Sequence, residues 1–250
     1  MILILAIIFL ILILVVGGDR GVISLLALCG NILVLLISVL AMTGGMPPIL
    51  TTLAGGVLVN CITLLYQNGK NKKTFAAVLS VGIVILILVA AVFVIAGRMH
   101  ISGLNEIELR SDFSSYYSFN ISVSMNQVCI SMIILGLLGA VMDTAVAISS
   151  AIYEVHDNNP HLTRAELYHS GIAMGKDVLA TTLNTLYFAY IGEALMLLLY
   201  LQKYNYSVVG MLNSESFLQE FTCIMFSAIG CLIIIPLSAE ISAWIFKEKD

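Results

Sequence analysis

Charged residues are scarce in this 250-residue sequence: Asp, Glu, Lys and Arg make up 10% of it, whereas a soluble domain carries roughly 25%. This scarcity argues against a soluble globular protein, and no basic patch suits nucleic acid. Proline occurs four times and tryptophan once. Hydrophobic residues instead form 60% of the chain, in blocks long enough to cross a bilayer, which takes about 20 residues. The composition predicts an integral membrane protein and leaves no stretch for a soluble enzyme domain.

Motifs that carry chemistry are also missing. The five cysteines lie in apolar blocks without a CxxC pair, which favours small buried hydrophobes over metal ligands or disulfides. His156, His161 and His169 are not spaced to share one helical face, which favours solvated loop histidines. No nucleophile–base pair, glycine-rich phosphate loop or metal motif is present. We therefore expect no enzymatic activity, no metal and no cofactor.

The apolar runs predict an all-α fold, a polytopic transmembrane helical bundle in a single domain, 1–250. Lys and Arg concentrate on the cytoplasmic side of membrane proteins. Placing eight of the 11 Lys and Arg residues on the cytoplasmic side gives about seven spans, with the N-terminus outside and the C-terminus inside. If the first run is re-entrant or lost, six spans remain with both ends inside. The seven predicted spans are residues 2–16, 21–42, 47–66, 75–97, 127–151, 178–201 and 220–246.

Two longer connections remain. Residues 98–126, rich in Ser, Tyr and Phe, form the predicted outer loop. Residues 154–177 are predicted to hold a cytoplasmic amphipathic connecting helix after the break at Pro160. Thr163 and Glu166 have the spacing of a capping box, with Thr163 as the cap and Glu166 reaching back to it.

Asp143 lies about midway along the fifth predicted span, and ionisable groups at membrane depth usually face a bundle interior or water. Its neighbours at helical spacing are small, which allows another helix to approach closely. The pattern favours a functional carboxyl, with a structural, hydrogen-bonded carboxyl as the alternative. The small helix-packing face consists of Gly136, Gly139, Ala140, Ala147 and Ser150.

A polar stripe follows the sixth predicted span. Its members lie at helical spacing, which suits either the lining of a hydrated proton or ion path or a hydrogen-bonding seam against the fifth span. Glu193, late in the same span, is a further candidate for this path. The stripe consists of Asp177, Thr181, Asn184 and Thr185.

Five stretches of this sequence are specific enough to compare with known families: GLLGAVMD from Gly136, SSAIYE from Ser149, GKD from Gly175, TTLNTL from Thr181 and AYIG from Ala189. They closely resemble the YibE/F family, and the short outer segment is similar to that of its shorter, YibF-like members. The resemblance implies a multi-pass protein of the bacterial plasma membrane, from a family without an established activity.

Spans five to seven also distantly resemble half of the membrane domain of SecD, SecF and other RND-superfamily proteins. That resemblance implies that Asp143 carries a proton, that Thr181 to Thr185 face it, and that a second half is supplied in the bilayer by a YibE-like paralogous subunit or a second copy of the chain. The leading hypothesis is a subunit of an RND/SecDF-like, proton-coupled transport or export complex. The alternative is a non-transporting scaffold or assembly factor, in which Asp143 pins helices together.

Overall fold

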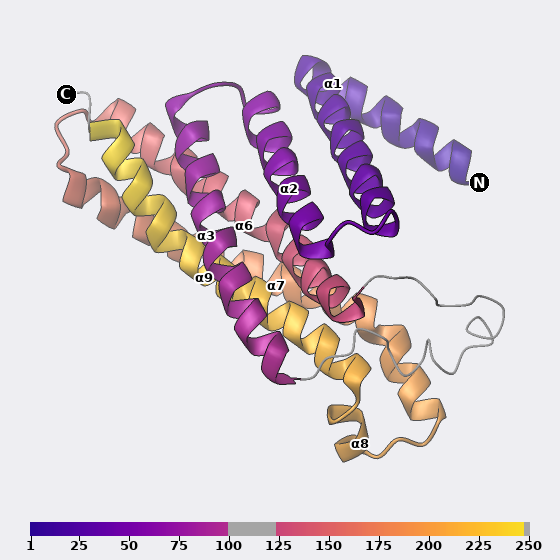
Figure 1. The fold of residues 1–250 in the computed structure, drawn as a ribbon. Coiled ribbons are helices and arrows are strands. Elements are labelled where there is room, and N and C mark those ends of the chain that lie inside the picture. Colours follow the sequence, from indigo (N-terminus) through magenta and orange to yellow (C-terminus); the bar gives the residue numbers. More distant parts are fainter. Residues whose placement is uncertain (100–123, 248–250) are drawn as a thin grey trace.

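A computed structural model describes residues 1–99 and 124–247. These residues form helices and contain no strand, so the all-α prediction is confirmed for them (Figure 1). The predicted outer loop, 98–126, lies mostly outside the described residues. In chain order the elements are α1 (Ile2–Thr43), α2 (Pro48–Asn60), the π-helix η1 (Cys61–Tyr66), α3 (Lys72–Met99), α6 (Met125–Asn158), α7 (Arg164–Lys203), α8 (Val208–Leu212) and α9 (Glu215–Lys247).

Six helical stretches among the described residues are long and apolar enough to cross a membrane. The first two predicted spans, 2–16 and 21–42, lie on either side of a sharp break at Gly18, which has φ 52° and ψ −136° and divides α1 into two helical segments. Residues with a side chain rarely adopt that backbone conformation, whereas glycine adopts it readily. The seven predicted runs therefore correspond to six long elements, the first of which is divided by this break, and the number of membrane crossings stays a prediction.

Helices α3, α6 and α9 form the centre of the bundle (Figure 1). Their facing sides are apolar and closely packed, because branched side chains recur at helical spacing on each of them. Val84 and Leu88 of α3, Leu137 and Val141 of α6, and Ile234 of α9 are fully or almost fully buried in this core.

A second core lies where the end of α6, the start of α7 and the end of α9 meet. Gly171 and Gly175 form a small-xxx-small pair on α7, a pattern that lets helices approach closely. A Cβ atom at residue 171 would lie 2.5 Å from Ile152 Cδ1 and 2.9 Å from Ala239 Cβ. At residue 175 it would collide with Ile235. The two glycines therefore fix how closely α7 packs against its neighbours.

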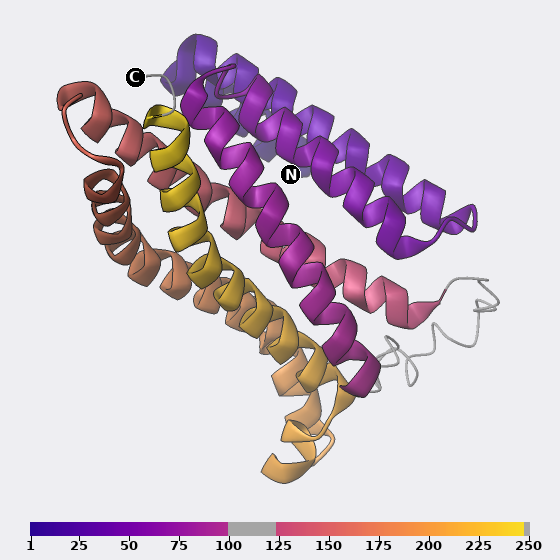
Figure 2. The same ribbon diagram turned by 60° about the vertical axis from the view of Figure 1, so that its left-hand side comes forward.

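Helix α7 begins with the predicted capping box, which is confirmed. The Thr163 backbone N–H donates to Glu166 Oε2 at 2.7 Å, and the Glu166 N–H donates to Thr163 Oγ1 at 3.3 Å. The helix then continues for 40 residues, curving along its length (Figure 2). The connecting helix expected over 154–177 is thus not separate: α6 extends to Asn158, and α7 runs unbroken into the sixth predicted span, because no proline or non-helical glycine interrupts it.

One end of the bundle gathers the kink of α1, the α2–α3 and α6–α7 connections and the end of α9 (Figures 1 and 2). Arg164 forms an ion pair with Glu240 there, and Lys247 Nζ donates to the Pro160 carbonyl at 2.8 Å. We call it the basic end, because Arg20, Lys73, Arg164 and Lys247 lie there. Which side of the membrane it faces stays a prediction.

Candidate functional site

Asp143 lies on the side of α6 that points away from the central core. Its neighbours Met142 and Thr144 are buried against the bundle, whereas Asp143 itself is exposed. Within the described residues its carboxylate forms no hydrogen bond and no ion pair. The helix periodicity that buries the core residues therefore turns this carboxylate outward.

The predicted small face of α6 surrounds Asp143 and is largely open. Gly136 and Gly139 are exposed, Ala147 and Ser150 are half-buried, and Ala140 is buried. A Cβ atom at Gly139 would meet nothing within 4 Å, whereas one at Gly136 would lie 2.8 Å from Tyr190 Oη of α7. A neighbouring helix of this chain thus approaches the glycines of the small face only at Gly136, among the described residues.

The polar stripe of α7 is also exposed, at Asp177, Thr181, Asn184 and Thr185. The Thr181 hydroxyl donates to the Val178 carbonyl at 2.9 Å, and the Thr185 hydroxyl donates to the Thr181 carbonyl at 2.9 Å. These two threonines therefore satisfy their hydroxyls within their own helix. In the described part of the chain, no hydrogen bond joins the stripe to Asp143.

A groove of about 560 Å³ runs between α7 and α9, and its lining is mainly apolar. Asn184 contributes to the lining, and so does Glu220 of α9, a half-buried carboxylate that the sequence analysis did not single out. Glu193 is exposed on α7, within electrostatic range of Glu220. Glu220 is the first residue of the last predicted span, 220–246. That position suggested a carboxylate at the membrane surface, so the sequence analysis passed over it.

Comparison with protein families places these helices in a known group. The sequence profile of the YibE/F-like protein family matches residues 5–248, nearly the whole chain. The chain belongs to the YibE/F-like family. Comparison of this YibE/F-like protein with curated proteins and with solved structures gives no match. The resemblance to SecD, SecF and other RND proteins therefore stays a hypothesis.

The chemical groups at this site of the YibE/F-like protein are a carboxylate and several hydroxyl and amide side chains. Within the described residues no three His, Cys, Asp or Glu side chains come together to hold a metal ion. The arrangement instead provides one carboxylate at mid-helix, on a face that small residues leave open. A carboxyl group in this position can gain or lose a proton. The protonated form tolerates apolar surroundings, whereas the ionised form needs water or polar groups around it.

Proposed function

We propose that this YibE/F-like protein is a subunit of a proton-coupled, RND/SecDF-like transport or export complex in the bacterial plasma membrane. The observation that carries the proposal is the outward position of Asp143 on an apolar helix, with no partner in the described chain. A charged carboxylate facing lipid is costly, by several kcal/mol in most measurements and calculations. A second protein surface or a hydrated path between the two subunits would remove that cost.

The second subunit is proposed to be a YibE-like paralogue or another copy of this chain, which would supply the other half of the site. Protonation of Asp143 removes its charge and allows close apolar packing, whereas ionisation demands water or polar groups around it. Binding and release of a proton would therefore favour different packings of α6 against its partner. The exposed stripe from Asp177 to Thr185, with Glu193, is proposed to line the path by which protons reach the site. The proposal assigns no enzymatic reaction to the chain.

The test is proton flux in proteoliposomes that contain the protein with the partner that co-purifies with it. Asp143→Asn keeps the size and hydrogen-bonding capacity of the side chain but cannot ionise. We expect flux under an imposed pH gradient and membrane potential to fall at least about tenfold, because the proton site is lost. Asp157→Asn removes an exposed carboxylate from the basic end of the same helix and should leave flux unchanged.

The mass of the purified complex distinguishes a second copy from a paralogous partner. Wild-type flux in an intact Asp143→Asn complex would contradict the proposal. The alternative, a non-transporting scaffold or assembly factor, is favoured by the same open face of α6, which suits attachment to another membrane protein. That alternative predicts a stable complex without flux in either form.

A further inference from the structure

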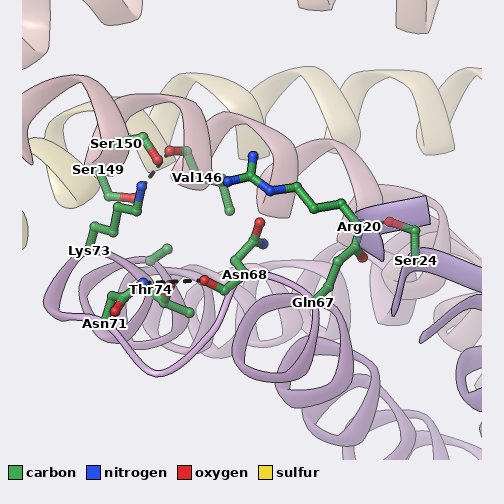
Figure 3. A pocket seen from close by; sticks show the side chains of 11 residues that line it. Arg20, Ser24, Gln67, Asn68, Asn71, Lys73, Thr74, Val146, Ser149 and Ser150 are labelled. Atoms are coloured by element: carbon green, nitrogen blue, oxygen red, sulfur yellow. Dashed lines mark hydrogen bonds between the residues drawn. The ribbon is translucent and has the colours of Figure 1, made fainter. Parts of the chain in front are cut away.

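A polar cavity of about 290 Å³ lies at the basic end of the bundle (Figure 3), and Asp143 does not line it. Small-molecule pockets in proteins typically begin at roughly this size. Three parts of the chain that are distant in sequence form its walls: the middle of α1, the connection from η1 into α3, and the last third of α6.

Local backbone features bring these walls together. The kink at Gly18 is followed at once by Arg20 and Ser24, both of which line the cavity. The π-helix η1 ends at Tyr66, and the next residue, Gln67, lines the cavity. Gln67 Nε2 donates a hydrogen bond to Ser24 Oγ at 3.1 Å. π-Helices are rare and frequently occur at functional sites.

The charge of the cavity has one sign. Arg20 and Lys73 extend into it from opposite ends (Figure 3), and no carboxylate is among the described residues that line it. Asp19 and Glu154, acidic residues close to the lining in sequence, are not part of the lining. Lys73 Nζ lies 5.6 Å from the centre of the Tyr153 ring, a cation–π contact that leaves its positive charge uncompensated.

Two residues of the lining present hydrogen-bond donors that the protein itself leaves unused. Arg20 and Thr74 form no hydrogen bond or ion pair within the described part of the chain, although Thr74 is 4% exposed. Thr74 also belongs to the first turn of the 28-residue helix α3, where backbone N–H groups have no helical acceptor. Helix N-termini of this kind favour anions.

We propose that this cavity binds a phosphate group, carried by an anionic lipid headgroup or by a soluble phosphate compound. Two cations, the unpartnered hydroxyl of a buried threonine and a helix N-terminus converge on a space that no carboxylate of the described residues lines. Arginine is well suited to phosphate because its guanidinium offers two parallel donors. Basic pockets between membrane helices are known to bind lipid headgroups. This proposal is independent of the proton-carrying role proposed for Asp143.

The experiment measures lipid retention by native mass spectrometry. The purified protein is offered phosphatidylglycerol and glucosyl diacylglycerol with identical acyl chains, so that only the first carries phosphate. We expect about a tenfold preference for phosphatidylglycerol, which Arg20→Gln should reduce to near parity. Lys70→Gln, an exposed residue of the same connection that does not line the cavity, should retain the preference. Arg20 is exposed and unpartnered, so its replacement leaves the packing intact; Lys73→Gln provides a second variant.

A parallel measurement distinguishes the source of the phosphate. Inorganic phosphate is compared with chloride at equal ionic strength in thermal unfolding, with and without Arg20→Gln. Lipid preference alone identifies a headgroup site, and stabilisation by phosphate alone identifies a site for a soluble compound. Absence of both effects in the wild type overturns the proposal. Equal losses in Arg20→Gln and Lys70→Gln overturn it too, because they would show unspecific attraction to the basic end.

Discussion

Tyr190 of α7 and Ser227 of α9 share a hydrogen bond, with their side-chain oxygens 3.0 Å apart, beside Gly136 of α6. The missing side chain at residue 136 makes room for the Tyr190 hydroxyl, since a Cβ atom there would lie 2.8 Å from it. Three helices thus meet at one polar contact on the edge of the small face that carries Asp143.

Tyr190→Phe should lower the free energy of unfolding by about 1 kcal/mol, because it removes this hydrogen bond and leaves the buried Ser227 hydroxyl without its partner. Unfolding in mixed detergent micelles, followed by circular dichroism, measures the change. Tyr187→Phe is the matched control, because Tyr187 is 54% exposed on the same helix. Equal effects of the two substitutions would show that the hydrogen bond contributes nothing.

Gly171→Ala should destabilise the protein by about 1–3 kcal/mol, because the new methyl group would overlap Ile152 and Ala239 in the second core. Gly192→Ala, on the same helix, meets nothing within 4 Å and should be neutral or stabilise by up to about 1 kcal/mol. Thermal unfolding in detergent compares the two. A stable Gly171→Ala protein would mean that α7 can move away from its neighbours without cost.

The first turn of α7 should loosen in acid. The Thr163 backbone N–H and the Thr163 hydroxyl donate to the Glu166 carboxylate, which holds the pKa of Glu166 below its ordinary value. The stabilisation is therefore complete above the unfolded pKa, about 4.3, and is lost as the pH falls through the lower folded pKa.

Hydrogen exchange at the amides of Glu166 and Leu167, corrected for intrinsic rates, measures this loosening between about pH 6 and about pH 3. Glu166→Gln removes the titrating group, so its protection should not change with pH. The same acid-dependent loss in that variant would assign the effect to another group.

Local signals in the sequence predicted local structure well. The apolar runs correspond to the long helices, and the capping box at Thr163 and Glu166 is formed, because its partners are three residues apart. Helical spacing also identified which residues share the face of Asp143. It could not show whether that face turns inward or outward, since the answer depends on where α3 and α9 pack.

Features that depend on distant contacts or on single backbone angles were not predictable. The apolar runs placed a break between residues 16 and 21, but not its angle, which depends on the conformation of Gly18. The continuity of α7 past Asp177 removes a boundary that the change from polar to apolar residues suggested. The cavity joins Arg20 to Lys73, which are far apart in sequence and meet only through the packing of α1, α3 and α6.

The unbroken length of α7 connects the two ends of the bundle mechanically. Gly171 and Gly175 hold it tightly against α6 and α9 near one end, and the Tyr190–Ser227 hydrogen bond and the buried Leu201 hold it again further along. At about 1.5 Å per residue, roughly 40 Å of helix separate Gly175 from Lys203. A shift of α7 at the basic end would therefore be transmitted along one continuous helix to these later contacts.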